Sequence, residues 1–390
     1  MILGVDASRA SGQRFGVGRA IEHILDSWAR QDLPFDQVRL FSPSPLESVP
    51  ANGRFVQEVS HSAAPPLWWQ TTSLRAKARQ VDAFFAPYTL PPWFQGRAVV
   101  FNLGIYEGPH AIPGWRARAR SRHMAYSARR ADLVLANCPT TKADLVSFFG
   151  VDPLKIRVLP EGRDPWFRPG QPGEEDLLRR TVTEVLGVDA PYMMFVGKPS
   201  LRRHIPELIE GFSLAAPSNE LRLLLVGPRT PEVDADHLAA RLGVADRVHH
   251  VPYIEHDALR LLYRGARAYG MLSEKDGFPT TLLEALGSGC PTLTLRGASL
   301  GALEYLNGPR DWASGGPVLE ASDVRPASLA KAIERLAMDD DLCAELGRRA
   351  QQYAATLPTW DEIAARIMES LAEVAGVAAG EADRTPDMQA

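Results

Sequence analysis

Short apolar runs alternate with helix-like segments along most of the chain, and this alternation constrains the fold more than any other feature. In the first half such runs occur at 2–5, 37–41, 81–86, 97–103, 131–136 and 155–160. In the second half they occur at 192–197, 221–227, 248–251, 268–272 and 291–295. Buried strands that alternate with helices are typical of mainly parallel sheets covered on both faces. The sequence therefore predicts an α/β fold.

A polar segment separates the two series of strands and helices. Residues 168–184 are rich in Pro, Gly and charge, and 390 residues exceed one ordinary core. We expect two Rossmann-like domains, 1–170 and 191–356, facing each other across a cleft and joined by a linker at 171–190. A helix at 357–378 and a disordered tail at 379–390 would complete the chain.

Composition excludes several classes of protein. The formal net charge of −4 argues against a nucleic-acid partner. The three cysteines, Cys138, Cys290 and Cys343, are odd in number and widely spaced, which suits a reducing compartment better than a disulfide framework or a metal cluster. Asp339 to Asp341 fall between two helical patterns, so helix capping explains them better than a metal site. Because no apolar run has membrane-spanning length and no secretory signal opens the chain, we expect a cytoplasmic location.

The segment 273–286 places two carboxylates, Asp276 and Glu284, around a loop that turns into a helix. Gly277 permits a tight turn, and Pro279 suits the first helical position. The backbone N–H groups that follow would be free to bind phosphate. They belong to Thr280, Thr281 and Leu282. In a nucleotide sugar, phosphates lie between two groups that carry hydroxyls, so a phosphate site between two acids that bind hydroxyls suits such a ligand. The alternative is an ordinary helix start, with Asp276 near the cap and Glu284 on a solvated face.

Two further loops follow predicted strands. Gly16 and Gly18 close a strand-to-helix loop, where the backbone could approach a ligand or simply make a tight turn. Lys198 and Arg203 follow the strand that ends at Gly197, and such cations could clamp a diphosphate or form a solvated basic turn. Since ligands bind at the carboxyl ends of parallel strands, both loops and segment 273–286 are expected at the cleft.

Residues 115–130 contain six arginines. Arg116, Arg118, Arg120 and Arg122 spread around a helix rather than clustering, so we interpret this stretch as a solvated helix with basic ends. The alternative is a patch that meets an anionic acceptor or a membrane surface, as a peripheral contact.

These motifs together resemble a known family. Asp276 to Ala285 resembles the acid–seven–acid motif of the retaining glycosyltransferases of family 4 (glycosyl transferases group 1), which have the GT-B fold. Phe15 to Arg19 is similar to the glycine loop of that family, closest to its mannosyltransferase-like branch, and Gly197 to His204 to its diphosphate-binding loop. Trp360 to Val377 resembles the C-terminal helix that crosses back to the first domain.

The resemblance implies roles for these residues. Asp276 would contact the donor sugar, Glu284 would bind the ribose, and Lys198 and Arg203 would stabilise the leaving diphosphate. The remaining donor-binding positions would be Gly16, Gly18, Gly197, Gly277, Phe278, Pro279, Thr280 and Thr281. Residues 1–170 would hold the acceptor and 191–356 the nucleotide sugar, a GDP- or UDP-sugar. The acceptor would be a saccharide or a small molecule, and no metal or other cofactor would be required.

The sequence departs from the family at two positions. Asp276 stands where the family usually has Glu, so the sugar contact would shift, and Glu274 is an alternative acid. Asn102 falls near the His of a family His-Asp pair, and no Asp follows it. This implies an altered contact to the outer sugar hydroxyls, an unusual donor such as a deoxy sugar, or reduced activity. Two alternatives to a hexosyltransferase therefore stay open: a nucleotide-sugar epimerase or hydrolase, and a weakened nucleotide-sugar-binding partner of another transferase.

Overall fold

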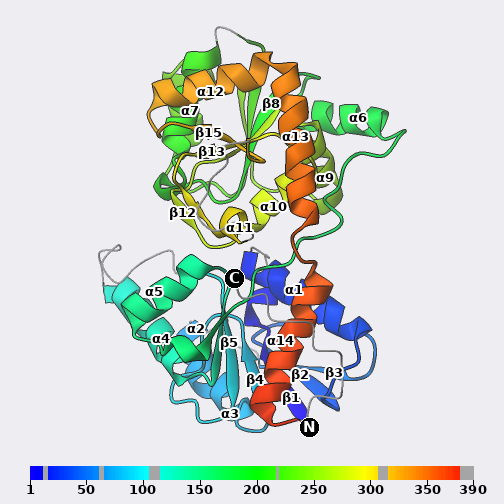
Figure 1. The fold of residues 1–390 in the computed structure, drawn as a ribbon, viewed down its shortest axis with the longest axis vertical. Coiled ribbons are helices and arrows are strands. Elements are labelled where there is room, and N and C mark those ends of the chain that lie inside the picture. The colour runs from blue at the N-terminus through cyan, green and yellow to red at the C-terminus, as the bar shows by residue number, and fades with distance from the viewer. Residues whose placement is uncertain (12–15, 61–65, 105–114, 217–218, 306–314, 378–390) are drawn as a thin grey trace. The chain divides into compact units, whose positions relative to one another are not determined.

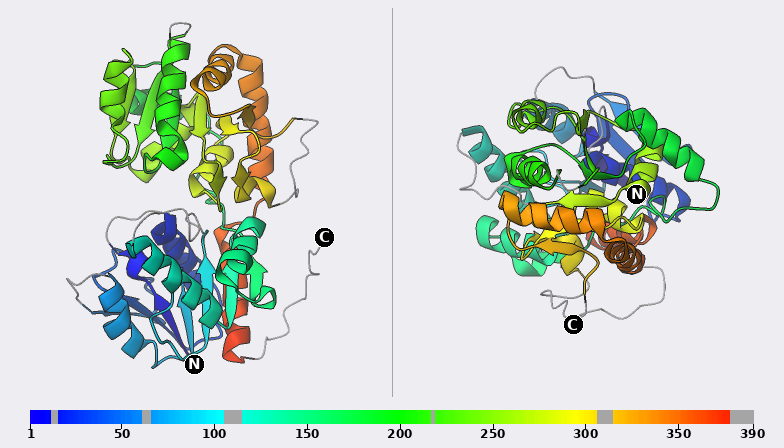
Figure 2. Two further views of the ribbon diagram at one scale, coloured as in Figure 1. Left: turned by 90° about the vertical axis from the view of Figure 1, so that its left-hand side faces the viewer. Right: turned by 90° about the horizontal axis from the view of Figure 1, so that it is seen from above.

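The computed structural model describes residues 1–11, 16–60, 66–104, 115–216, 219–305 and 315–377 (Figure 1). The chain forms two compact units: the first contains Met1–Gly162 and the segment from Trp360 onward, and the second contains Arg163–Thr359. Phe15 and the tail expected at 379–390 lie outside the described residues. In each unit helices cover both faces of a parallel sheet (Figure 2), as the alternating pattern predicted.

The first unit contains a seven-stranded parallel sheet in the order β3-β2-β1-β4-β5-β6-β7. Its strands are β1 (Ile2–Asp6), β2 (Gln37–Ser42), β3 (Phe55–Val59), β4 (Ala83–Ala86), β5 (Ala98–Asn102), β6 (Leu133–Ala136) and β7 (Ile156–Val158). Its helices are η1 (Ser8–Ala10), α1 (Gly16–Arg30), α2 (Pro66–Trp69), the π-helix η2 (Gln70–Leu74), α3 (Arg75–Lys77), α4 (Trp115–Arg130), α5 (Pro139–Phe149), η3 (Pro153–Lys155) and α14 (Trp360–Ala375).

Neighbouring residues of one strand supply the two cores of this unit. Phe85 packs with α1 and α14 in one apolar cluster, whereas Phe84 packs with α4 and α5 in the other. The helix expected over 357–378 is α14, and it packs against α1. The indole N–H of Trp28, a fully buried residue of α1, donates to the carbonyl of Ala364 at 2.8 Å. A segment from the far end of the chain thus completes the first core.

The second unit contains a six-stranded parallel sheet in the order β10-β9-β8-β11-β13-β15, and a pair, β12-β14. The strands are β8 (Tyr192–Val196), β9 (Arg222–Val226), β10 (Val248–Val251), β11 (Ala268–Met271), β12 (Lys275–Asp276), β13 (Thr292–Leu295), β14 (Ser299–Leu300) and β15 (Leu319–Ala321). The helices are α6 (Glu175–Leu186), η4 (Leu201–Arg203), α7 (Ile205–Ala215), α8 (Ala235–Arg241), α9 (His256–Gly265), α10 (Thr280–Gly287), α11 (Gly301–Glu304), α12 (Pro326–Met338) and α13 (Asp340–Ala355).

The segment expected to be a linker, 171–190, instead contains helix α6. Just before it, Glu174 accepts from Arg260 at 2.8 Å and from Arg264 at 2.9 Å, and α6 packs on α9 within the second unit. Most residues of α6 are polar, so its narrow apolar stripe, which includes the buried residues Val182 and Leu186, was not recognised in the sequence. The division between the units falls at residues 162 and 163, ahead of the polar segment.

The structure also bears on two smaller expectations, helix capping by Asp339 and the pairing of the three cysteines. Asp339 caps α13, because its side chain accepts from the N–H of Leu342 at 2.9 Å, which confirms the capping interpretation. The three cysteines are buried, and none of them forms a disulfide among the described residues. Within the described ranges, no helix is both long and apolar enough to cross a membrane.

Candidate functional site

The strand order of the second unit reverses between β8 and β11. From β8 the chain proceeds outward through β9 and β10, and from β11 it proceeds the other way through β13 and β15. The loops that leave the carboxyl ends of two such strands diverge and leave room for a ligand. The loop after β8 is the basic loop 197–204, and the loop after β11 leads into segment 273–286. The two motifs therefore lie at the position where α/β sheets bind ligands.

The loop after β8 is shaped around the guanidinium of Arg203. Gly197 has a φ of +135°, in the region that favours glycine, and a Cβ there would lie 2.0 Å from Nη1 of Arg203. The guanidinium carbon of Arg203 lies 5.8 Å from the centre of the Phe195 ring. Lys198 is exposed, and no hydrogen bond or ion pair joins its side chain to another residue of the described chain. One predicted cation is thus held in place, and the other is accessible.

Asp276 is a buried acid beside this loop. It lies in β12, which pairs in parallel with β14, and its side chain is only 4% exposed. Nη1 of Arg202 lies 3.5 Å from Oδ2 of Asp276 and donates to the carbonyl of Lys275 at 3.0 Å. Oδ2 accepts no hydrogen bond from the described residues, so it could accept one from a ligand. Arg202 does not stand out in the sequence, where its only signal is that it directly precedes Arg203.

Glu274, the alternative acid, has a different environment. Its side chain is 73% exposed, and Oε1 lies 3.4 Å from Nε2 of His204. His204 precedes α7 with a φ of +51°, unusual for a residue with a side chain. Glu274 is therefore a surface partner of the basic loop, whereas Asp276 is buried.

Helix α10 begins one residue later than expected. Pro279 is the N-cap residue in an extended conformation rather than the first helical residue, and its carbonyl accepts from the N–H of Leu282 at 3.0 Å. The prediction that this N–H group would be free is wrong. The N–H groups of Thr280 and Thr281 have no acceptor within the described ranges. Glu284 is buried, so the alternative that placed it on a solvated face is also wrong.

Tyr269 in β11 links the members of this cluster. Its hydroxyl donates to Oγ1 of Thr281 at 2.8 Å, and burial raises the pKa of Tyr269. Arg203 opposes this rise in pKa electrostatically, whereas Glu284 and Asp276 add to it. The two acids and Arg203 therefore all lie within electrostatic reach of one buried phenol. Sequence reasoning missed Tyr269, whose only signal was its place in the strand before the motif.

The loop residues around Asp276 are packed tightly. Gly277 and Pro279 are buried, and the ring of Phe278 meets that of Tyr305 edge-on at 6.2 Å. Such packing holds the backbone before α10 in one conformation, which favours a preformed site.

The other predicted residues belong to the first unit. Gly16 and Gly18 lie in the first turn of α1 rather than in a loop, with Gly16 exposed and Gly18 buried. A Cβ at Gly16 would meet nothing within 4 Å among the described residues. This sheet also reverses its order, between β1 and β4. Asp6 ends β1, and burial raises the pKa of its carboxyl.

Asn102 ends β5, next to that reversal. It is 1% exposed, and its Oδ1 accepts from the N–H of Gly104 at 3.1 Å. Its Nδ2 is buried and donates to no described residue. Tyr88, between β4 and β5, has a strained φ of +127° and donates its hydroxyl to the carbonyl of Gly104 at 2.9 Å. Asn102 thus keeps one amide hydrogen-bonding group available, where the family motif has His.

Two family models match the chain. Residues 183–353 match the model described as "Glycosyl transferases group 1", and residues 16–167 match "Glycosyltransferase Family 4". The second model spans most of the first unit's sheet, and the first contains the whole of the candidate cluster.

Curated relatives and solved structures agree with these matches. The chain is 25% identical to mannosylfructose-phosphate synthase of Agrobacterium fabrum, over 64% of this chain and 55% of that protein. It is 29% identical to D-inositol 3-phosphate glycosyltransferase of Acidothermus cellulolyticus, over 87% of this chain and 78% of that protein. The chain thus spans little more than half of the first of these relatives.

Two solved structures show the fold. Anabaena HepE in complex with UDP and glucose superposes with a TM-score of 0.71 at 17% identity, over 95% of this chain and 99% of that chain. WaaG, a glycosyltransferase involved in lipopolysaccharide biosynthesis, gives 0.73 at 18% identity, over 95% and 99%.

Proposed function

Because the chain belongs to the group 1, family 4 glycosyltransferases and has their GT-B fold, we propose that it is a retaining hexosyltransferase. The donor is a UDP- or GDP-sugar, and the acceptor is a hydroxyl of a saccharide or small molecule. The observation that carries this proposal is the cluster of Asp276, Arg203 and Glu284 around Tyr269 at the strand-order reversal. Phe15 to Arg19 still favours the mannosyltransferase-like branch.

The proposed roles follow from burial and charge. Lys198 and Arg203 bind the diphosphate together with the N–H groups of Thr280 and Thr281, and Glu284 binds the ribose. As the bond between the anomeric carbon and the phosphate oxygen breaks, negative charge grows on the departing diphosphate, where these cations stabilise it. Asp276 accepts hydrogen bonds from the sugar hydroxyls.

Retention of configuration follows if the acceptor attacks from the face that the diphosphate leaves. The acceptor oxygen forms its bond to the anomeric carbon there, and its proton passes to an oxygen of the departing phosphate. No protein nucleophile and no metal takes part in this scheme. Unchanged turnover after treatment with a chelator would support metal independence.

The names of similar proteins support the substrate classes. HepE was solved with UDP-glucose, which favours a UDP-sugar donor. D-inositol 3-phosphate glycosyltransferase and mannosylfructose-phosphate synthase are named for small phosphorylated sugars or polyols, which favours a small-molecule acceptor.

A thermal-shift panel of UDP, GDP, ADP and dTDP tests the donor. A nucleotide at a hundred times its Kd should stabilise the protein by about 2.7 kcal/mol. Stabilisation by UDP or GDP alone is the expected result, and indifference to all four nucleotides would refute a nucleotide-sugar site.

Two matched variants test whether Asp276 or Glu274 contacts the donor sugar. Asp276→Asn removes the buried carboxylate and should lower acceptor-dependent release of nucleoside diphosphate about tenfold to hundredfold while nucleotide binding survives. Glu274→Gln removes the exposed carboxylate two residues earlier and should leave turnover nearly unchanged. The reverse order of effects would assign the sugar contact to Glu274.

One observation favours the second candidate, a nucleotide-sugar-binding partner without turnover. Asn102 replaces the family His, and one side of its amide is already used by the backbone of Gly104. Wild-type protein that binds UDP or GDP but releases no diphosphate with any acceptor would support that candidate. Release that does not depend on acceptor would instead indicate a hydrolase.

A further inference from the structure

Thr281, the second residue of α10, has a hydroxyl group that accepts a hydrogen bond from the interior of the second unit. The phenol of Tyr269, which is fully buried, donates to its Oγ1 at 2.8 Å. The thioether of Met271 competes only weakly for that proton, because its Sδ lies 3.7 Å away and sulfur is a poor acceptor. Burial raises the pKa of Tyr269, so the phenol stays protonated and remains the donor.

The proton of the Thr281 hydroxyl is therefore left for another acceptor. Threonines in helices often donate to the carbonyl four residues earlier. Thr181 and Thr183 of α6 do so, to Leu177 and Arg179, at 2.9 Å each. Thr281 makes no such bond to the described residues. Its side chain is partly exposed, so this O–H group is available to a ligand.

The same turn of helix presents two more donors. The N–H groups of Thr280 and Thr281 have no acceptor in the described part of the chain. The buried Asp276 is a separate sign of a ligand, because its side chain is 4% exposed and its Oδ2 accepts no hydrogen bond from the described residues. Arg203 and Asp276 both act electrostatically on the Tyr269 phenol. Three unpaired donors of α10 and the charge of Arg203 thus converge near Tyr269, which suits an anionic ligand.

We propose that the hydroxyl of Thr281 donates a hydrogen bond to an oxygen of the donor diphosphate, and that Tyr269 is the positioning residue that directs it there. The phenol occupies one lone pair of Oγ1 and so restricts the directions in which the O–H can point. The bond to the diphosphate strengthens as negative charge grows on it. This role rests on the proposed function, to which it adds a side chain that was expected to contribute only its backbone N–H.

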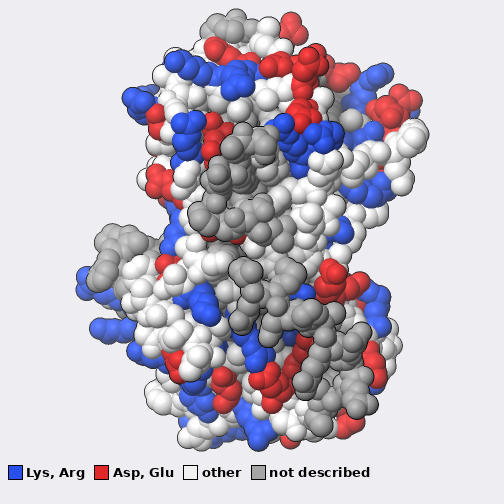
Figure 3. Space-filling model, viewed as in Figure 1, with Lys and Arg blue, Asp and Glu red and all other residues white. Residues whose placement is uncertain are grey.

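Surface charge does not identify this position. Lys, Arg, Asp and Glu side chains are interspersed on the face of the second unit that Figure 3 shows, whereas Tyr269 is buried and Thr281 only partly exposed. The alternative role for their hydrogen bond is structural, since it also fastens α10 to β11. In that case nucleotide affinity would follow stability in every variant, and the two can be measured separately.

Isothermal titration calorimetry of the full chain with UDP and GDP tests the hydroxyl. Thr281→Val keeps the shape of the side chain and should raise the Kd of the nucleotide that the wild type binds about tenfold, because a hydrogen bond to a charged group is lost. Thr281→Ser retains the hydroxyl and should stay within about threefold of the wild type. Uridine and guanosine carry no phosphate, so the Kd of the matching nucleoside should not change in either variant.

A double variant separates orientation of the hydroxyl from stability. Tyr269→Phe leaves the Thr281 hydroxyl but frees its rotation, and should raise the Kd about threefold. Adding it to Thr281→Val should raise the Kd no further, because Tyr269 acts through that hydroxyl. The melting temperatures should follow a different order. Thr281→Val leaves the buried phenol without its acceptor and should be the least stable, whereas the double variant removes both partners and should regain part of the loss.

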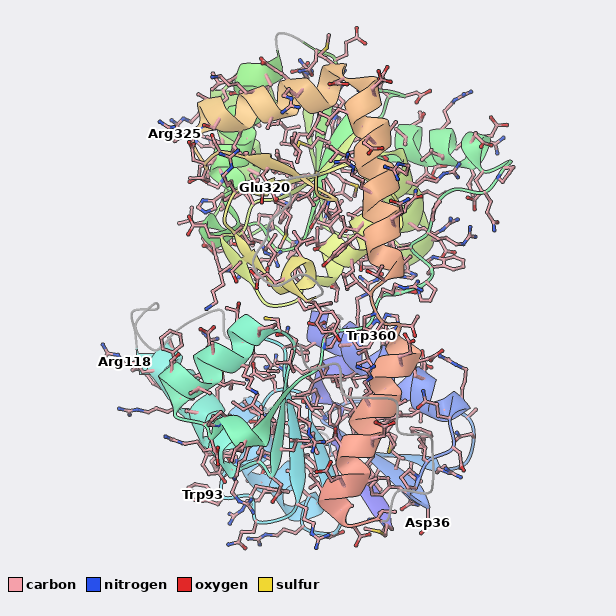
Figure 4. All side chains as sticks on the ribbon, in the orientation of Figure 1. Asp36, Trp93, Arg118, Glu320, Arg325 and Trp360 are labelled. Atoms are coloured by element: carbon pink, nitrogen blue, oxygen red, sulfur yellow. The ribbon has the colours of Figure 1, made fainter. Side chains whose placement is uncertain are left out.

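Two control variants change the second unit elsewhere. Thr183→Val removes a hydroxyl from α6, and Arg325→Gln removes a cation that extends outward from the start of α12 (Figure 4). Both should bind the nucleotide like the wild type. Wild-type affinity in Thr281→Val, or affinities that follow the melting temperatures, would overturn the role of Thr281 and leave the proposed function standing. A wild-type protein that binds neither UDP nor GDP would overturn both.

Discussion

Gly197→Ala should weaken the proposed diphosphate site without replacing a charged residue. The new Cβ would lie 2.0 Å from Nη1 of Arg203. Ordinary van der Waals contact needs about 3.5 Å, so the guanidinium would have to retreat by roughly 1.5 Å. A displacement of that size breaks a charge-assisted hydrogen bond, which contributes about 1.5–3 kcal/mol. We therefore expect the Kd for UDP or GDP to rise about tenfold to hundredfold.

The substitution also strains the backbone, because a φ of +135° is costly for alanine. Gly243→Ala provides the control: its φ is +72°, and its new Cβ would meet nothing within 4 Å among the described residues. Both variants should lose about 1–3 kcal/mol of stability in urea unfolding, and only Gly197→Ala should lose affinity in isothermal titration calorimetry.

A double-mutant cycle identifies the cause of the lost affinity. If Gly197→Ala acts by displacing Arg203, adding it to Arg203→Ala should weaken nucleotide binding no further. Additive losses, or full affinity in Gly197→Ala, would refute this reasoning.

Three other expectations concern stability. A hydrogen bond from Arg260, a second from the N–H of Gln171 and the charge of Arg264 lower the pKa of Glu174 to about 2 from 4.5. This carboxylate therefore stabilises the fold above about pH 4.5 and loses that effect as pH falls towards 2, and Glu174→Gln should flatten the dependence of the melting temperature on pH over that range. Trp28→Phe removes the bond to the carbonyl of Ala364 and leaves a cavity, and should cost about 2–4 kcal/mol in urea unfolding. Tyr269→Phe removes the bond to Thr281 and should cost about 1 kcal/mol by the same measurement, and an unchanged midpoint would show that this bond contributes nothing net.

The apolar strands could be predicted from the sequence, whereas two partly exposed edge strands, β3 and β15, could not. The apolar runs that become β1 and β8 are buried along nearly their whole length, which fixes them in the middle of a sheet. β3 has one buried residue followed by four half-buried ones, and β15 has only three residues. Both are edge strands, whose composition is close to that of a loop. Helix α6 escaped prediction for the related reason that most of its surface is polar.

The positions of loop residues in the candidate site could be predicted where one local segment determines them. Gly197 and the turn into α10 follow from the backbone requirements of neighbouring residues, so the sequence showed them. The approach of Arg202 to Asp276 depends on which of two adjacent arginines turns towards a distant loop. No local pattern specifies that choice, because it is set by the tertiary packing of the loops after β8 and β11.

The position of α14 determines the order in which the two units can fold while the chain is synthesised on the ribosome. The first unit is encoded in two pieces, and its core remains open at α1 until residues 360–375 have been synthesised. At about 5–20 residues per second, the second unit, which is encoded in one stretch, emerges during a delay on the order of 10–40 s. During that interval the indole of Trp28 and its apolar neighbours are not yet covered by α14. A chain that stalls before Trp360 would therefore expose an incomplete apolar core to chaperones and proteases.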